Sequence, residues 1–331
     1  MRILVTGGAG YIGAHVVRLL EETADEIVIV DDLKTGRRER LGDRDINVVD
    51  LAEPGSTELV ASLCRDHRID SIIHFAARKQ VGESVEAPIW YFQQNVGSLA
   101  NVLAAATEAG VSKFVFSSSA AVYGSPEVEM VTEETATLPV NPYGETKLVG
   151  EWLLSDVARA TDLAVASLRY FNVAGAGWPE LGDRAVLNLV PMVLERLDAG
   201  ESPLIFGDDY ATPDGTCVRD YIHVLDLARA HIAALQYLDG RVGENLVFNV
   251  GTGTGTSVGE MVEAILQVTG SSLRPEVRAR RSGDPARVVA SPGRINSELG
   301  WRAQYGLKEI VDSAWAAHCY FAQQTTEGGR V

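Results

Sequence analysis

Two residues in the segment NPYGETK are of types that move protons. Tyr143 and Lys147 lie four residues apart, and Pro142 favours a helix that begins just before them, so their side chains share one helical face. A free phenol has a pKa of about 10, which is too high for an efficient base at neutral pH. A neighbouring ammonium group favours the phenolate and lowers that pKa. The pair fits either an ordinary surface helix or a tyrosine that acts as a general base, and the rest of the chain decides between these interpretations.

A glycine-rich turn near the start of the chain predicts the cofactor. In MRILVTGGAGYIG an apolar strand leads into Gly7, Gly10 and Gly13, spaced G-x-x-G-x-x-G, and a helix follows. The glycines let the backbone approach a pyrophosphate at the helix N-terminus, whose amides and dipole favour an anion. Asp31 ends the next strand, where a carboxylate accepts hydrogen bonds from the adenosine ribose and repels a 2′-phosphate. These features predict NAD rather than NADP.

Later strand ends supply further residues to the same edge of the predicted sheet. Asp50 and Leu51 follow a strand and are expected beside the adenine, where the carboxylate can accept from the exocyclic amine. The small residues after SIIHF are expected along the pyrophosphate and ribose, because ligands bind at the carboxyl ends of such strands. Lys79 is expected to reach the nicotinamide ribose. We expect His74 to be a hydrogen-bonded core histidine.

Strand and helix patterns alternate along the first half of the chain. RILV, EIVIV, INVVD, SIIHFAA, KFVFSSS and LAVASLRYFN are continuous apolar runs rich in β-branched residues, which is typical of a parallel sheet covered on both faces. This predicts an α/β fold, a doubly wound parallel-sheet Rossmann domain with a smaller interleaved C-terminal substrate domain. We assign residues 1–174 and about 221–254 to the first, and about 175–220 and 255–331 to the second. GENLVFNVGTG is expected to return a strand to the main sheet.

Composition limits the kind of partner. The 331 residues are 46% hydrophobic, enough for a sizeable core, and carry a formal net charge of −16. This charge disfavours nucleic acid and anionic membranes, so an anionic ligand must be held by a local cluster of donors. The three cysteines show no metal-type spacing, and we expect reduced thiols in a cytoplasmic protein. No signal peptide, membrane span or metal site is expected.

Several segments in register from Met1 to about Trp301 resemble one family. FAARKQVGESVEAPIWYF, SSSAAVYG, PYGETK, LRYFNVAGA and DYATPDGTCVRDYIHVLDLARAH are together similar to the UDP-hexose 4-epimerases of the extended short-chain dehydrogenase/reductase family. The resemblance implies that UDP-galactose and UDP-glucose interconvert through a 4-keto sugar, with hydride passing to bound NAD and back. It also implies a homodimer, and catalysis by Ser119, Tyr143 and Lys147.

The resemblance extends to individual binding positions. For NAD it implies Gly7, Gly10, Tyr11, Ile12, Gly13, Asp31, Asp32, Asp50, Leu51, Phe75, Ala76, Ala77, Lys79, Asn95, Ser117, Tyr143, Lys147 and Tyr170. For the UDP-sugar it implies Lys79, Ser119, Tyr143, Phe171, Asn172, Asn188, Leu189, Leu204, Phe206, Arg219, Arg281, Asp284 and Val288. Arg219, Arg281 and Asp284 are expected at the diphosphate and uridine ribose, where a guanidinium clamps phosphate oxygens.

Three positions depart from the family pattern or leave it open. Leu187 stands before Asn188 where the family usually has another asparagine. Gln94 precedes Asn95 where consecutive asparagines are common, so either amide is a candidate for the cofactor contact. Val288 falls where a bulky aromatic excludes N-acetylated sugars and a small residue admits them. Activity on UDP-N-acetylhexosamines is therefore a hypothesis.

Three other functions are alternatives for a chain with these residues. A nucleotide-sugar 4,6-dehydratase needs an acid and a base directly after the serine, and Ala120 and Ala121 stand there. A UDP-glucuronate 4-epimerase would want an extra cationic site near C6. A non-catalytic NAD-sensing regulator typically loses the tyrosine or the lysine, and both are present here.

The remaining expectations concern assembly and local structure. The helices SLANVLAAATEAG and KLVGEWLLSDVARA are apolar enough to pair with their copies in a homodimer, or to pack on the sheet. Ser257 and Glu260 are predicted to form a capping box. His223 is expected to be structural, with Asp220 as its partner.

Overall fold

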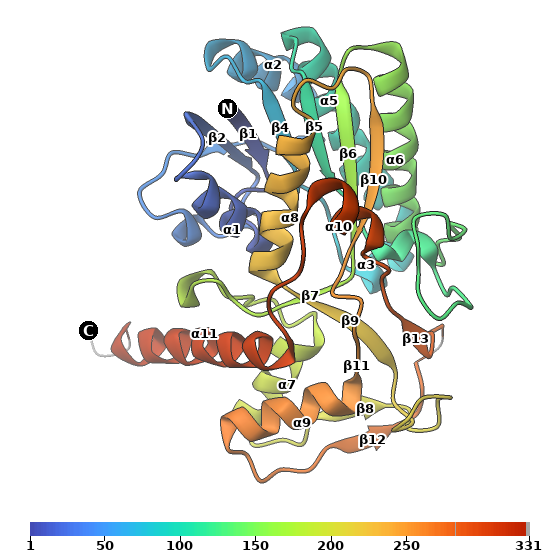
Figure 1. Cartoon of the computed structure of the whole chain (residues 1–331). Helices are drawn as coiled ribbons and strands as arrows, with labels where there is room; N and C mark the ends of the chain where they lie inside the picture. The colour runs from blue at the N-terminus through green and yellow to red at the C-terminus, as the bar shows by residue number, and fades with distance from the viewer. Residues whose placement is uncertain (282, 329–331) are drawn as a thin grey trace.

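A seven-stranded parallel sheet forms the larger part of the molecule (Figure 1). The structure is a computed structural model that describes residues 1–281 and 283–328. The strand order is β10-β6-β5-β4-β1-β2-β3. The strands are β1 (Arg2–Thr6), β2 (Glu26–Asp31), β3 (Asn47–Val48), β4 (Ser71–His74), β5 (Lys113–Ser117), β6 (Ala164–Tyr170) and β10 (Asn245–Val250). The predicted doubly wound α/β class is confirmed, and the segment at 245–250 does return to this sheet, beside β6.

Helices cover both faces of the sheet, which explains the continuous apolar strands. One layer contains α1 (Tyr11–Leu20) and α8 (Val224–Tyr237), and the other contains α2 (Ser56–Asp66), α5 (Ser98–Ala109) and α6 (Pro142–Ala160). Within β1, Ile3 and Val5 pack into the first layer and Leu4 into the second. Successive strand side chains point to opposite faces, so every position of such a strand is buried.

A smaller part of the molecule lies below the main sheet in Figure 1 and contains two short sheets. Its strands are β7 (Asn172–Ala174), β8 (Leu204–Phe206), β9 (Val218–His223), β11 (Gly255–Ser257), β12 (Glu276–Arg278) and β13 (Arg287–Val288). Its helices include α7 (Leu189–Asp198), α9 (Val258–Thr269) and α11 (Leu307–Gly328), while α10 (Gly293–Leu299) lies against β10. The chain crosses between the two parts several times, because β9 belongs to a small sheet and α8 directly after it covers the large one.

The predicted capping box is present, whereas the predicted contact between His223 and Asp220 is not. Ser257 and Glu260 form the predicted capping box of α9. His223 accepts from the backbone N–H of Leu225 and contacts Ser313, so its structural role is confirmed but its pairing with Asp220 is wrong. The two residues lie three apart in β9, and positions at that spacing face opposite sides of a strand. Asp220 instead accepts hydrogen bonds from the 252–253 turn and from residue 290.

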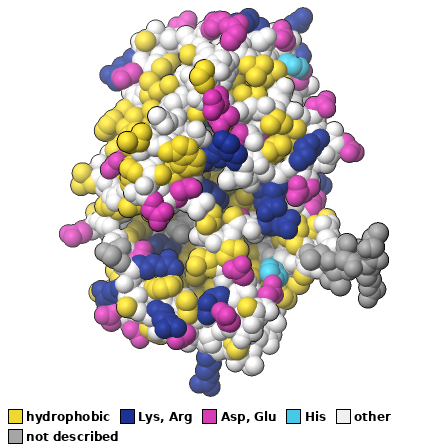
Figure 2. Space-filling model, turned by 180° about the vertical axis from the view of Figure 1, so that it is seen from behind, with side chains coloured by type: hydrophobic (Ala, Val, Ile, Leu, Met, Phe, Trp, Pro, Cys, Tyr) yellow, Lys and Arg dark blue, Asp and Glu magenta, His cyan; other side chains and the backbone are white. Residues whose placement is uncertain are grey.

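The order of the strands places the site. β1 lies between β2 and β4, and the chain after β1 turns into α1, so the connections diverge at the carboxyl end of β1. Ligands of doubly wound sheets bind at this kind of switch point. Seen from behind, the surface is hollowed between the larger and smaller parts, with basic and acidic side chains along the hollow (Figure 2). Within the described residues, no helix is both long and apolar enough to cross a membrane.

Candidate active site

The glycine turn between β1 and α1 borders a cavity of about 600 Å³. Gly7 has a φ of 70°, in the left-handed region that glycine adopts without strain. A Cβ on Gly13 would overlap the carbonyl oxygen of Gly7, so the first turn of α1 packs directly on the glycine turn. Gly10 caps α1, and the residues after it line the cavity, which brings the positive end of the helix dipole to it.

Most of the residues predicted to bind NAD line this one cavity. They come from the glycine turn, the strand ends and α6: Gly7, Gly10, Tyr11, Ile12, Gly13, Asp31, Asp32, Asp50, Leu51, Phe75, Ala76, Ala77, Lys79, Ser117, Tyr143, Lys147 and Tyr170. Segments far apart in the sequence therefore meet at one edge of the sheet.

Asp31 and Asp32 present two carboxylates to one end of the cavity. Asp31 is buried and accepts hydrogen bonds from the backbone N–H groups of Ala9, at 3.0 Å, and Leu33, at 2.9 Å. Burial raises the pKa of Asp31, and these two amides act in the opposite direction. Carboxylates at this position suit ribose hydroxyl groups and disfavour a 2′-phosphate.

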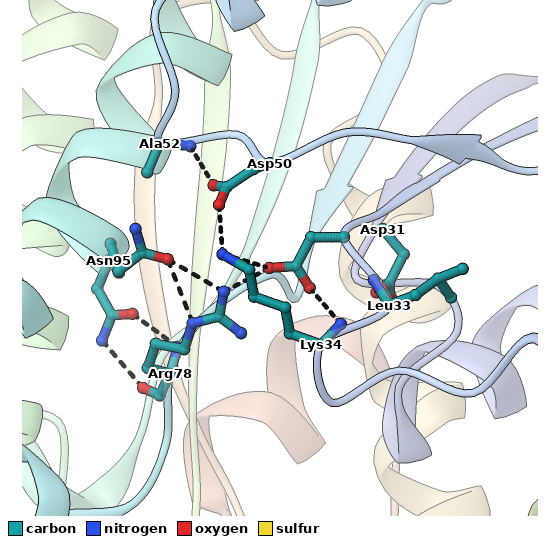
Figure 3. A network of polar contacts seen from close by, with 9 residues as sticks. Asp31, Leu33, Lys34, Asp50, Ala52, Arg78 and Asn95 are labelled. Atoms are coloured by element: carbon teal, nitrogen blue, oxygen red, sulfur yellow. Dashed lines mark hydrogen bonds and ion pairs between the residues drawn. The ribbon is translucent and has the colours of Figure 1, made fainter.

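Arg78 lies at the centre of a charged network at the same end (Figure 3). It forms an ion pair with Asp32 and donates to Gln94 Oε1 at 3.0 Å. Lys34 donates to Asp50 at 2.6 Å and lies 3.9 Å from Asp32. The sequence placed the Asp50 carboxylate beside the adenine, and the structure adds a lysine partner to it. Arg78 was not predicted, because its main partner comes from another loop.

The structure distinguishes the two neighbouring amides of QQNVG. Gln94 lines the cavity, whereas Asn95 is not among the lining residues. Asn95 accepts from the backbone N–H of Arg78 at 2.7 Å and donates to the carbonyl oxygen of Arg78 at 3.0 Å. It also donates to Thr146 Oγ1 at 3.0 Å, so it ties the loop after β4 to α6.

Tyr143 and Lys147 share one face of α6, as predicted, and both line the cavity. The helix begins where the sequence indicated, with Pro142 in its first turn and the Asn141 side chain as its N-cap. Lys147 Nζ lies 5.9 Å from the centroid of the Tyr143 ring and donates to the carbonyl oxygen of Ser117 at 2.8 Å. The ammonium group is thus held between α6 and the end of β5.

Burial changes the acidity of both groups. It lowers the pKa of Lys147 to about 7, and the carboxylate of Glu151 opposes this shift. Burial also raises the pKa of Tyr143 well above its ordinary value; Tyr170 adds to the increase, and a hydrogen bond with Ser119 opposes it. A phenol with a lowered pKa was expected from the sequence. That expectation included the positive nicotinamide ring of NAD⁺ and stays a prediction, whereas in the protein by itself burial has the largest effect on this pKa.

A buried ion pair supports this arrangement from behind. Arg169 on β6 donates to Glu151 on α6 through Nε at 2.9 Å and Nη2 at 2.5 Å. Ser118 Oγ donates to the same carboxylate at 2.5 Å. Since Glu151 follows Lys147 by one turn and Ser118 precedes Ser119, the Ser118–Glu151 hydrogen bond joins the two segments that carry the predicted catalytic residues. An arginine inside an apolar strand was the sequence signal for it.

The serines after β5 have different positions. Ser117 lines the cavity and its Oγ donates to the hydroxyl of Tyr170 at 3.1 Å. Ser119 begins a short turn, and its Oγ accepts from the backbone N–H of Ala121 at 3.2 Å. Ser119 is not among the lining residues, although it lowers the pKa of the Tyr143 phenol against the effect of burial.

Five of the predicted substrate residues lie around β8, β9, β13 and the loop before β13. Arg219 on β9 is the register partner of Val288 on β13. Arg219 Nη2 lies 3.6 Å from Asp284, and its Nη1 donates to a backbone carbonyl of the same loop. The guanidinium of Arg281 lies 4.0 Å from the centroid of the Phe206 ring. None of these side chains is among those that line the cavity described above.

The other predicted substrate residues lie at element ends or in the core. They are Asn172 at the start of β7, Leu204 at the start of β8, Asn188 and Leu189 at the start of α7, and the buried Phe171. Asn188 Nδ2 donates to Asp183 at 3.0 Å. Leu187, the residue that replaces an asparagine, lines the cavity beside Asp183.

Known proteins resemble this chain over its whole length. The sequence profile of the NAD dependent epimerase/dehydratase family matches residues 3–251. The UDP-glucose 4-epimerase of Azospirillum brasilense is 43% identical over 335 residues, covering 99% of this chain and 95% of that protein.

Solved structures also resemble this chain over nearly its whole length. The UDP-glucose-4-epimerase from Stenotrophomonas maltophila, with bound NAD and formylated UDP-arabinopyranose, has a TM-score of 0.92 and 39% identity, covering 98% of this chain and 99% of that one. The UDP-glucose 4-epimerase from Brucella ovis, in complex with NAD, has a TM-score of 0.89 and 41% identity, covering 96% and 98%.

Proposed function

Because the chain belongs to the NAD dependent epimerase/dehydratase family, we propose that it interconverts UDP-galactose and UDP-glucose, the reaction of UDP-glucose 4-epimerases. The reaction inverts C4 of the hexose through a 4-keto intermediate. The observation that carries the proposal is the shared cavity, which extends from the glycine turn and Asp31 to Tyr143 and Lys147. A cofactor site and a proton-transfer pair thus lie within one space.

NAD is the cofactor that this cavity fits. Gly7 and Gly13 allow the turn to pack closely, because a Cβ at either position would meet backbone atoms of the protein. This close packing brings the N-terminus of α1 to the cavity, where its amides suit a pyrophosphate. Asp31 would accept hydrogen bonds from the hydroxyl groups of the adenosine ribose. Lys147 would donate a hydrogen bond to the ribose at the nicotinamide end. When bound, NAD would supply the transfer of a hydride from the sugar and back to it. The protein needs no second redox partner for this chemistry.

Tyr143 moves the proton at the C4 oxygen. Its phenol removes the hydroxyl proton during oxidation and gives it back during reduction, while Ser119 donates to the same substrate oxygen. The buried site raises the pKa of the phenol, so the charge of Lys147 is needed to favour the phenolate. Glu151 supports that charge, because its carboxylate opposes the effect of burial on Lys147.

The substrate residues grip the nucleotide and leave the sugar free to turn. Arg219 and Arg281 hold the diphosphate, Asp284 holds the uridine ribose, and Phe206 lines the uracil. In the structure Arg281 already lies on the Phe206 ring, which supports a common role. A sugar held only through its phosphate can present either face for hydride transfer.

Val288 decides whether N-acetylated sugars enter. It is a medium-sized residue that packs with Phe171 next to Arg219. We propose that the chain also acts on UDP-N-acetylglucosamine, and comparison of its turnover with that of UDP-glucose tests this. Absence of any N-acetyl product would remove the proposal and leave the main activity standing.

Exposed apolar side chains on and beside α6 support a homodimer. Trp152 on α6 is 58% exposed, and Ile89 on α4 (Pro88–Phe92) is 76% exposed. Pairing with a second copy across a two-fold axis would cover both side chains. We propose this homodimer, and cytoplasmic localisation in line with the free thiols. Sedimentation of Trp152→Glu against wild type tests the interface, and an unchanged mass would contradict it.

Proton NMR of the purified protein with UDP-galactose, and no added cofactor, tests the proposed activity. Appearance of UDP-glucose signals is the expected result, and it also means that the cofactor stays bound through purification. A new methyl signal from a 4-keto-6-deoxy sugar would indicate dehydration instead, for which Ala120 and Ala121 offer no acid or base. No change after addition of NAD⁺ would contradict the proposed function.

A further inference from the structure

The network around Arg78 joins the loops that follow β4 and β2 (Figure 3). Arg78 follows β4 and Asp32 follows β2, and these strands are separated in the sheet by β1. Strands two apart are on the order of 10 Å from each other. The Arg78–Asp32 ion pair therefore connects the loops on either side of β1 and of the glycine turn that follows it. Both of its residues line the cavity.

The arginine end of this bridge is firmly held. Asn95 fixes the backbone of Arg78 through hydrogen bonds in both directions, at 2.7 and 3.0 Å. Gln94 accepts from the guanidinium at 3.0 Å, and the side chain is only 10% exposed. A guanidinium with a fixed backbone and a second acceptor loses little freedom when it binds a carboxylate.

The carboxylate end is fixed as well. Asp32 is 18% exposed and accepts from the backbone N–H of Lys34 at 3.0 Å. The Lys34 side chain continues the network to Asp50 on the next loop, but it is 53% exposed. Charge-assisted hydrogen bonds out of water are stronger than exposed ion pairs, so Arg78–Asp32 is the strong link of the network.

We propose that the Arg78–Asp32 bridge is a strap that retains the dinucleotide in its cavity. This inference rests on the proposed use of NAD. The reaction oxidises and then reduces the same sugar, so loss of the reduced cofactor between the two steps would strand the 4-keto sugar. A bridge that must open before the dinucleotide leaves keeps the redox equivalent with the sugar. Entry of the cofactor requires the same opening.

The rate of NAD⁺ release tests the strap directly. Protein loaded with NAD⁺ is desalted and mixed with excess alcohol dehydrogenase and ethanol, which convert released NAD⁺ to NADH for detection by absorbance. Arg78→Met, Asp32→Asn and the double variant are compared with wild type. Arg38→Met is the control, because this arginine of the β2 loop donates to Gly42 in its own loop and is not among the cavity-lining residues.

Arg78→Met and Asp32→Asn should each speed release by about tenfold or more, the factor associated with a hydrogen bond between charged groups. The double variant should release no faster than Arg78→Met, since the two residues act through one bond. Arg38→Met should match wild type.

Equal release from Arg78→Met and wild type overturns the strap. So does fast release from Arg78→Met with a normal rate for Asp32→Asn, which would mean that Arg78 contacts the dinucleotide itself. Fast release from Arg38→Met would mean that loss of any nearby positive charge speeds NAD⁺ release, and it would overturn the strap too. A wild-type protein that retains no NAD⁺ after loading contradicts the proposed cofactor, and the strap with it.

Discussion

Replacing Lys147 with methionine should stabilise the nucleotide-free protein while abolishing its activity. The side chain is 4% exposed, and burial lowers its pKa from 10.5 to about 7. One pKa unit corresponds to about 1.4 kcal/mol, so keeping this lysine charged in the folded protein costs about 4 to 5 kcal/mol. Methionine has a similar length and no charge, although it leaves the carbonyl oxygen of Ser117 without its donor.

The pH dependence separates these two effects. Below pH 7 Lys147 is charged in both the folded and unfolded states, and the full cost is present. Between pH 7 and 10.5 the unfolded chain binds a proton that the folded chain does not, so wild-type stability rises by about 1.4 kcal/mol per pH unit. The hydrogen bond from Lys147 to Ser117 that is lost in the variant adds a contribution to the difference in unfolding free energy that does not change with pH. The advantage of Lys147→Met should therefore shrink by about 2 kcal/mol between about pH 6.5 and 8.5.

Urea denaturation of both proteins across this range measures the difference in unfolding free energy. Both must be free of dinucleotide, because bound ligand adds its own stabilisation. Lys79→Met is the matched control, since it removes an exposed lysine from the same cavity. A difference for Lys147→Met that is flat with pH would refute the argument that burial sets the charge of this lysine.

Three further substitutions address the base, the supporting ion pair and the glycine turn. Tyr143→Phe should lower kcat with UDP-galactose by about 10³-fold and leave the bound NAD content unchanged, as nucleotide absorbance would show. Arg169→Leu leaves the buried Glu151 carboxylate unpaired and should cost about 3 to 5 kcal/mol in urea denaturation, most of it regained when Glu151→Leu is added. Gly13→Ala should reduce NAD retention in the release assay, whereas Gly82→Ala, which meets open space, should not.

The main sheet was predictable because its strands carry a strong local signal. Both faces are covered by helices, so β1 and β5 are continuous apolar runs that differ clearly from the helices between them. The strands of the smaller part carry no such signal. β13 has only two residues, Arg287 and Val288, and exists because it pairs with β9. A strand of that length shows no periodicity, and its pairing depends on a distant segment.

The same distinction applies to the site. The glycine turn and the Tyr143–Lys147 spacing are local patterns whose geometry follows from one turn or one helix. Arg78 binds Asp32 from a loop two strands away, and no local pattern indicates that contact. The effect of burial on the pKa of Tyr143 has no local signal for a related reason, since burial depends on everything packed around the side chain.

The two buried cations of α6 and β6 show why the helix face is arranged as it is. Arg169 is paired with Glu151 through several hydrogen bonds, whereas Lys147 donates to a carbonyl oxygen and bears the cost of burial in its lowered pKa. Glu151 lies one turn from Lys147 on the same helix, so its carboxylate favours the charged lysine even though Arg169 balances it. Stability would be served by a neutral residue at position 147. The proposed chemistry accounts for the lysine, because a cation at that place favours a phenolate at Tyr143.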